Sequence, residues 1–104
     1  MIRKATKMKV LAGCYEEYQK RHDELWPEME TMLKAHGASQ YSIFLDQETG
    51  DLFAYVVLES EALWAEVPKQ EICQKWWAYM SDIMEVNADH SPKSWALDEV
   101  FYLG

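Results

Sequence analysis

A proton-transfer group stands in the middle of the stretch from Tyr15 to Met29. His22 follows Tyr18 by four residues, so on a helix the imidazole and the phenol share one face with Tyr15 and Leu25. An imidazole titrates near pH 6.5 and can give or take a proton at neutral pH. The spacing therefore indicates acid–base chemistry. The alternative, which this stripe alone favours, is a core helix whose Tyr and His tips pair with backbone groups.

The adjacent pair Trp76-Trp77 is the second candidate. Neighbouring helical residues point about 100° apart, so both rings cannot belong to one buried stripe. One ring packs while the other lines a cavity, or both flank the cavity, or the second contacts a partner chain. Tyr41 begins an alternating strand face, and we expect its hydroxyl to join Tyr18 and His22 between sheet and helix. Such rings with polar tips suit sites for ligands that are partly polar and partly apolar.

The histidines do not form a metal site. His36 lies fourteen residues after His22, which is about 20 Å along a helix, and Pro27 disrupts the helical phase between them. His90 falls in a distant polar loop. No Gly-rich phosphate loop, nucleophile elbow or cofactor fingerprint is present, so we expect neither metal nor cofactor.

Composition limits the remaining possibilities. A chain of 104 residues, 49% of them hydrophobic, predicts a single domain spanning 1–104. The net charge of −8 argues against nucleic acid or an anionic membrane as partner. Cys14 and Cys73 have no paired metal or redox spacing, which indicates a reducing compartment. Without an apolar leader or a span of membrane length, a cytoplasmic location is expected.

The candidate residues must be positioned by the elements around them. Residues 2–12 alternate as a strand with one wet face. A helix begins near residue 15, and Pro27 disfavours helical angles at Trp26, so this helix should break near Leu25. A second helix should restart at Pro27 and end at Gly37.

The second half begins with a predicted hairpin. Strands are predicted over 39–46 and 52–59, with a hairpin turn over 48–51. Helices are predicted over 61–67, stopped by Pro68, and over 70–86, followed by a polar loop over 87–93 and a last strand from Leu97 to Leu103. Trp26 and Trp64 are interpreted as packing residues, and Trp95 as a brace for the last strand.

The order β-α-β-β-α-β is that of an α+β, ferredoxin-like fold, a four-stranded antiparallel sheet with its helices on one face. The other sheet face keeps Phe, Tyr, Val and Leu side chains that need cover. We therefore expect a homodimer, with Leu97 to Leu103 as a candidate for contact with the partner chain.

Taken together, these motifs closely resemble those of the L-rhamnose mutarotase family. The resemblance runs over the whole chain and is carried by Tyr18, residues 21–23, residues 25–28, Tyr41, Trp76 and Trp77. It implies a dimeric α+β barrel that interconverts the α and β anomers of L-rhamnose. By the same resemblance His22 is the proton donor, and the sugar-binding residues are Tyr18, Tyr41, Trp76 and Trp77.

Anomer exchange is chemistry that an imidazole can assist. The pyranose ring opens, the aldehyde carbon presents its other face, and the ring closes again. A neutral imidazole is expected to donate a proton to the ring oxygen and to recover it on closure, which typically contributes about 10²–10⁴-fold. The residue that takes the anomeric proton is left open, since Asp23 points about 100° away from His22.

Two other functions remain open at this stage. The same fold resembles cofactor-free monooxygenases and haem-degrading enzymes of the dimeric α+β barrel group, for which an apolar aromatic or haem ligand is expected. The third possibility is a non-catalytic sugar-binding dimer.

Overall fold

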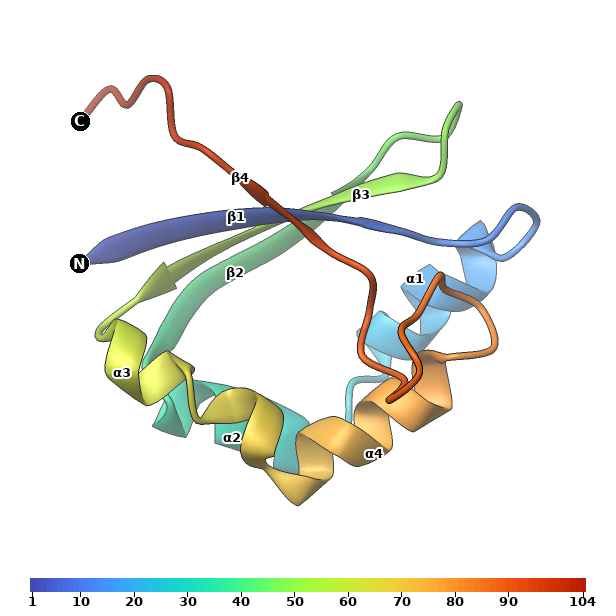
Figure 1. Ribbon diagram of the computed structural model, residues 1–104, viewed down its shortest axis with the longest axis horizontal. Coiled ribbons are helices and arrows are strands. Elements are labelled where there is room, and N and C mark those ends of the chain that lie inside the picture. Colours follow the sequence, from blue (N-terminus) through green and yellow to red (C-terminus); the bar gives the residue numbers. More distant parts are fainter.

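The computed structural model describes residues 1–104 as one antiparallel sheet with helices on one of its faces (Figure 1). The strands are β1 (Ile2–Lys9), β2 (Ala38–Leu45), β3 (Asp51–Leu58) and β4 (Trp95–Leu97), in the spatial order β2-β3-β1-β4. The helices are α1 (Tyr15–Asp23), α2 (Pro27–Ala35), α3 (Glu61–Trp64) and α4 (Glu71–Met80), with a short 3₁₀ helix, η1 (Val67–Lys69). The predicted ferredoxin-like fold is confirmed.

The first helical region is interrupted where the sequence predicted. α1 ends at Asp23, and Trp26 adopts an extended backbone with ψ of 131° before Pro27. Proline disfavours helical angles in the residue before it and loses no hydrogen bond as the first residue of a helix. At the end of α2, Gly37 turns the chain into β2 with φ of 90°. The break leaves His22 near the C-terminal end of α1.

An irregularity in β2 sets the direction of Tyr41. Ser39 pairs with Val57 and Ser42 pairs with Tyr55, so two residues, Gln40 and Tyr41, lie opposite one residue of β3. Gln40 absorbs the extra length with φ of 49°, as a β-bulge requires. The bulge restores the alternation beyond it, so Tyr41 shares the helix-covered face with Ile43.

Two predicted helices are shorter than expected. The helix predicted over 70–86 ends at Met80, because the following backbone pairs with the end of β1 instead. Leu11 donates to the carbonyl of Ile83 at 2.8 Å, and Glu85 donates to that of Lys9 at 3.1 Å. The helix predicted over 61–67 ends at Trp64, and Pro68 lies within η1 rather than just after a helix.

The last strand is displaced from its predicted position. β4 spans Trp95–Leu97 and pairs with Lys7 to Ala5 of β1, whereas residues 98–104 lie in no regular element. Arg3 donates two hydrogen bonds of 2.9 Å to the carboxylate of Glu99 and lies over the ring of Tyr102. This tail projects beyond the sheet (Figure 1), and its apolar side chains Val100, Phe101 and Leu103 are exposed.

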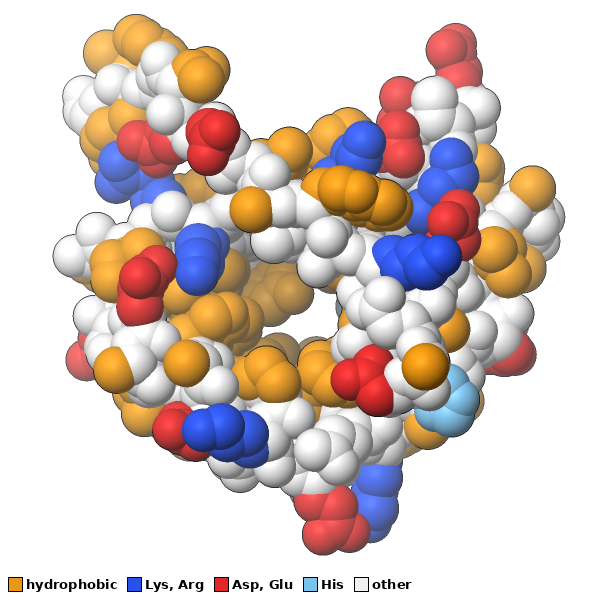
Figure 2. Space-filling model, viewed as in Figure 1, with side chains coloured by type: hydrophobic (Ala, Val, Ile, Leu, Met, Phe, Trp, Pro, Cys, Tyr) orange, Lys and Arg blue, Asp and Glu red, His pale blue; other side chains and the backbone are white.

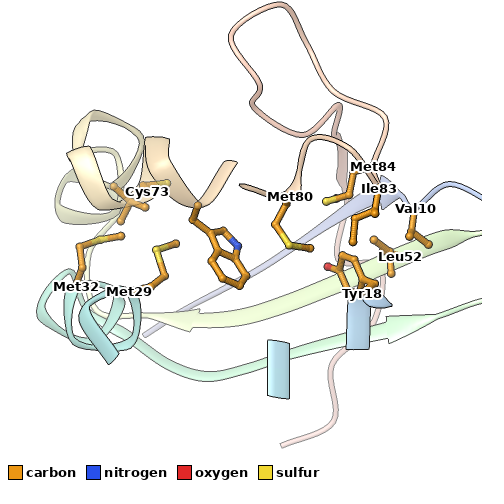
Figure 3. Packing of buried hydrophobic residues seen from close by; sticks show 11 residues of the cluster. Val10, Tyr18, Met29, Met32, Leu52, Cys73, Met80, Ile83 and Met84 are labelled. Atoms are coloured by element: carbon orange, nitrogen blue, oxygen red, sulfur yellow. The ribbon is translucent and has the colours of Figure 1, made fainter. Parts of the chain in front are cut away.

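The core residues lie between the helices and the sheet, in a row from Met32 and Cys73 to Val10 and Leu52 (Figure 3). Their cluster joins β-strand residues to sulfur-containing and aromatic side chains of the helices, and consists of Val10, Tyr18, Met29, Met32, Leu52, Val67, Cys73, Trp76, Met80, Ile83 and Met84. No polar or charged residue is buried. No helix combines the length and apolar character that crossing a bilayer demands.

The opposite face of the sheet is apolar and uncovered. Register places Phe44 beside Phe53, and Trp95 and Leu97 on the same side. These side chains are 66%, 38%, 47% and 40% exposed, respectively. An exposed apolar patch of this kind is typical of an interaction surface.

Candidate active site

A cavity of about 1170 Å³ lies between the helix-covered face of the sheet and the helices. It opens through the molecule as a hollow walled largely by hydrophobic side chains (Figure 2). All five residues predicted from the sequence line it: Tyr18, His22, Tyr41, Trp76 and Trp77. The structure therefore brings together residues from α1, β2 and α4 that lie up to 59 positions apart in the chain, from Tyr18 to Trp77.

His22 is held between two aromatic rings. Its imidazole stacks on the phenol ring of Tyr18, with centroids 4.3 Å apart and an interplanar angle of 29°. The indole of Trp76 meets it almost perpendicularly, with centroids 5.4 Å apart. These contacts fix the ring on two sides and leave the cavity side free.

The hydrogen bonds of His22 determine which ring nitrogen is free. Nδ1 lies 3.1 Å from the backbone carbonyl of Tyr18, and a carbonyl can only accept, so Nδ1 carries the proton in the neutral form. Nε2 makes no hydrogen bond within the protein. Every buried side-chain nitrogen and oxygen does make one, so Nε2 is not buried. Nε2 is therefore accessible from the cavity, as an unprotonated acceptor.

The surroundings keep His22 uncharged. Burial lowers the pKa of the imidazole below its ordinary value, because the charged form loses its hydration. The hydrogen bond to the Tyr18 carbonyl and the charge of Asp23 oppose this effect but do not overcome it. The neutral form consequently predominates at neutral pH.

The two phenols remain protonated for the same reason. Burial raises the pKa of Tyr18 and of Tyr41, because the charged phenolate would lose its hydration. The nearby Tyr41 phenol raises the pKa of Tyr18 further, and the Cys73 thiol raises that of Tyr41 further. Tyr41 is nevertheless 44% exposed. The two observations agree if its accessible surface faces the cavity, which it lines. Both phenols can therefore donate and accept hydrogen bonds toward a ligand.

The tryptophan pair divides as the helical angle predicts. Trp76 is buried in the core cluster and shows one part of its ring to the cavity, whereas Trp77 is half-buried and lines the cavity wall. Trp26 packs against Trp76 at 5.0 Å between centroids, which agrees with the packing role predicted for it.

Trp64 is a cavity residue that the sequence analysis missed. It packs against the core cluster, as predicted. It also lines the cavity, and its ring lies 6.3 Å from that of Tyr41. Its place on a short helix directly after β3 was the available signal for this second position. Cys73 also lines the cavity, where burial raises the pKa of its thiol to about 11, so it stays protonated.

No three His, Cys, Asp or Glu side chains are grouped so that they could hold a metal ion. The chemistry that this arrangement supports is proton transfer by one imidazole in a cavity with aromatic walls and two phenol groups. Such a cavity suits a small ligand with hydroxyls on one side and C–H groups on the other.

Comparison with known proteins points consistently to one family. The family model described as L-rhamnose mutarotase matches residues 3–103. A protein named L-rhamnose mutarotase from Shouchella clausii is 63% identical over 103 residues, which is 99% of each chain. The crystal structure of an L-rhamnose mutarotase from Formosa agariphila superposes with a TM-score of 0.93 at 46% identity, over 100% of both chains.

A more distant likeness concerns the architecture alone. A putative antibiotic biosynthesis monooxygenase from Nitrosomonas europaea has a TM-score of 0.64 at 12% identity, over 98% of this chain and 92% of that one. At this level of identity the two proteins share a fold and nothing more can be transferred.

Proposed function

The chain belongs to the L-rhamnose mutarotase family, and from that premise we propose that His22 carries the interconversion of the α and β anomers of L-rhamnopyranose. The reaction class is that of an isomerase, as the full-length family match indicates. The single observation that supports the role of His22 is the state of its ring: Nδ1 is occupied by the Tyr18 carbonyl while Nε2 is free toward the cavity.

The proton path follows from that ring state. Neutral Nε2 accepts the proton of the anomeric hydroxyl as the bond between C1 and the ring oxygen breaks. The imidazolium so formed gives this proton to the ring oxygen, which yields the open-chain aldehyde. After rotation about the C1–C2 bond, the reverse transfers close the ring on the other face, and no net proton is consumed.

This path changes the order expected from residue type alone. The sequence analysis expected the neutral imidazole to donate first, but its one proton sits on Nδ1 in the hydrogen bond to Tyr18. His22 therefore acts as acceptor and then as donor within each ring opening. Both sugar oxygens are bonded to C1, so one nitrogen can serve each in turn, and no separate base is required.

The remaining cavity residues bind the sugar. Tyr18 and Tyr41 remain protonated, so their hydroxyls can donate to and accept from sugar hydroxyls. Trp76 and Trp77 offer aromatic surface to the C–H face and the methyl group of a 6-deoxy sugar. Their contribution is binding and orientation, with no part in proton transfer.

Saturation-transfer NMR on equilibrated L-rhamnose tests the activity. Irradiation of the H1 signal of one anomer transfers saturation to the other only if the two exchange during the measurement. We expect catalytic amounts of protein to increase this transfer above the spontaneous rate. A protein that binds the sugar without increasing exchange would be a sugar-binding dimer and not a mutarotase.

The monooxygenase alternative has no support beyond shared architecture, because the resemblance is at 12% identity. Addition of haem to the purified protein should give no Soret band of a bound complex.

We further propose that the protein is a homodimer and acts in the cytoplasm. The uncovered apolar sheet face and the exposed tail around Phe101 and Leu103 support the dimer, since water-exposed apolar surface of this kind is stabilised by a second copy. The two free thiols, Cys14 and Cys73, support a reducing compartment.

A further inference from the structure

Arg21, the residue before His22, makes an unusually complete set of contacts. Its Nε donates to Glu17 at 2.8 Å within α1. Its two terminal nitrogens donate to the Asp82 carboxylate at 2.8 and 3.3 Å, and one of them also donates to the Tyr79 carbonyl at 2.7 Å. The guanidinium thus joins α1 to the C-terminal end of α4. Figure 1 shows these two helices as neighbours on the same face of the sheet.

This contact differs from the other ion pairs of the protein in its burial. The Arg21 side chain is 11% exposed, whereas Lys34 and Lys75, which pair with acids on their own helices, are 70% and 64% exposed. Exposed ion pairs within one helix contribute little to stability. The Arg21 guanidinium is partly shielded from solvent, although its partner Asp82 is 67% exposed. A guanidinium that binds a carboxylate with two nitrogens also constrains geometry.

Arg21 also completes the end of α4. The Tyr79 carbonyl lies in the last turn, where the next turn supplies no donor, because Ile83 donates to Met80 instead. Carbonyls at a helix C-terminus carry partial negative charge and favour a cation. The guanidinium carbon in addition lies 4.5 Å from the centre of the Tyr79 ring, within cation–π range.

From Tyr79 a series of ring contacts returns to the catalytic imidazole. The Tyr79 ring is 5.6 Å from that of Trp76, and Trp76 is 5.4 Å from His22. Trp26 braces both, at 5.3 Å from Tyr79 and 5.0 Å from Trp76. His22 and Arg21 are neighbours on α1. The contacts therefore form a closed series that runs from Arg21 through Tyr79 and Trp76 of α4 back to His22.

We propose that Arg21, anchored by Asp82, is a positioning residue that fixes Trp76 on α4 relative to His22 on α1. This inference rests on the proposed function, because it assigns a role in the same site. Arg21 does not touch the sugar: it sets the distance between the ring that moves the proton and the wall against which the sugar lies.

Small errors in that distance have large effects on the rate. A misplacement of about 1 Å can reduce a rate by about 10²-fold even when the chemical groups are intact. Binding depends on many cavity contacts and should change less. The expected signature is therefore a loss in kcat with a nearly unchanged KM.

Two variants weaken the anchor from opposite sides. Arg21→Lys keeps the charge but loses the planar fork, and Asp82→Asn keeps the shape but loses the charge. Lys75→Gln is the matched control, since it removes an exposed ion pair from α4 next to Trp76. In Arg21→Lys and Asp82→Asn we expect kcat for anomer exchange to fall by about tenfold, with KM within about threefold of the wild-type value. In Lys75→Gln we expect both kcat and KM to be unchanged.

A second readout does not depend on activity. Ring currents from Tyr18 and Trp76 displace the NMR signals of the His22 ring protons. In Asp82→Asn and Arg21→Lys these signals should move toward the shifts of an unstacked histidine, while Lys75→Gln keeps them in place. If the wild-type protein does not accelerate exchange, the proposed function fails, and the ring signals still decide whether Arg21 positions His22.

Folded Asp82→Asn and Arg21→Lys proteins with kcat within about twofold of the control and unchanged His22 signals would overturn the proposal. A lower melting temperature with both readouts unchanged has the same meaning, because the contact would then stabilise the fold without positioning the site. Should Arg21→Lys fail to fold, Asp82→Asn alone decides, since Asp82 is exposed and lies outside the core.

Discussion

Both faces of the sheet carry apolar side chains, but the surroundings of these side chains are very different. On β3, Leu52 and Leu58 point toward the helices and are fully buried, while Phe53, between them in the alternation, remains accessible on the other side. The helix-covered face encloses the cavity with His22, and the opposite face carries an uncovered aromatic patch. One chain therefore supplies a complete set of candidate catalytic and sugar-binding groups but leaves one apolar face without cover.

Substitutions on the two faces should therefore have different effects. Changes on the cavity face should affect catalysis and leave assembly intact. Changes on the outer face should affect assembly first, because Phe44, Phe53 and Trp95 lie outside the cavity and stay partly exposed on an uncovered surface. Each prediction below applies to one face and uses the other as its reference.

The largest expected effect is on the cavity face, in His22→Gln. Glutamine keeps a similar size and can hydrogen-bond, but it cannot accept and release a proton at neutral pH. We expect catalysed exchange to fall by about 10²-fold or more, the range that positioned proton transfer supplies. The measurement is saturation transfer between the H1 signals of the two anomers, with the spontaneous rate subtracted.

The control for this variant is its assembly. His22→Gln should sediment as wild type does and should still bind L-rhamnose, because the phenols and indoles are unchanged. Near-wild-type exchange in the folded variant would remove His22 from the mechanism and leave a tyrosine as the next candidate.

On the outer face, Phe53→Asp should dissociate the dimer. The substitution introduces a charge where the partner's apolar surface is expected, and an unpaired buried charge is strongly unfavourable. We expect the dimer dissociation constant to rise by about 100-fold, measured by sedimentation at micromolar concentration. Ala62→Glu, which adds the same single charge at an exposed position of α3, should leave it unchanged.

The result that contradicts this account is a wild-type protein that sediments as a single 12.2 kDa species at these concentrations. The outer face of the sheet would then remain exposed to water in a stable monomer. The proposal that a second copy of the chain covers this face would be wrong.

A smaller effect is expected for Trp77, on the cavity wall. Trp77→Phe retains aromatic surface and should keep most of the activity. Trp77→Ala should raise KM by about tenfold, because the sugar loses the binding free energy of about one aromatic contact. kcat should change less than KM, since the ring takes no part in proton transfer. An unfolded Trp77→Ala protein would instead assign this half-buried ring to the core.

Local sequence signals predicted much of this arrangement because they act over a few residues. Pro27 stops α1 through its restricted backbone, and Gly37 ends α2 because glycine tolerates a positive φ. Alternation along the strand predicted that Tyr41 faces the helices. The convergence of His22 and Trp76 was expected from the fold order and the family resemblance together.

The features that escaped prediction depend on distant partners. The end of α4 at Met80 is decided by backbone pairing with the end of β1, and the position of β4 by where β1 offers a free edge. The pair of Arg21 with Asp82 joins residues 61 positions apart, which no local pattern indicates. Trp64 was assigned to packing because a ring beside a cavity and a ring in a core have the same sequence pattern.

The pH dependence of catalysed exchange tests the central claim, that neutral His22 moves the proton, most directly. Burial lowers the pKa of His22, so the active neutral form predominates at neutral pH and is lost only as the pH falls through that lowered value. We predict that exchange decreases on acidification with a midpoint below about 6.5, the ordinary value for histidine. The NMR titration of the His22 ring should give the same midpoint, and residual exchange in His22→Gln should show no such transition. Catalysed exchange that increases on acidification, or a midpoint that persists in His22→Gln, would contradict the account.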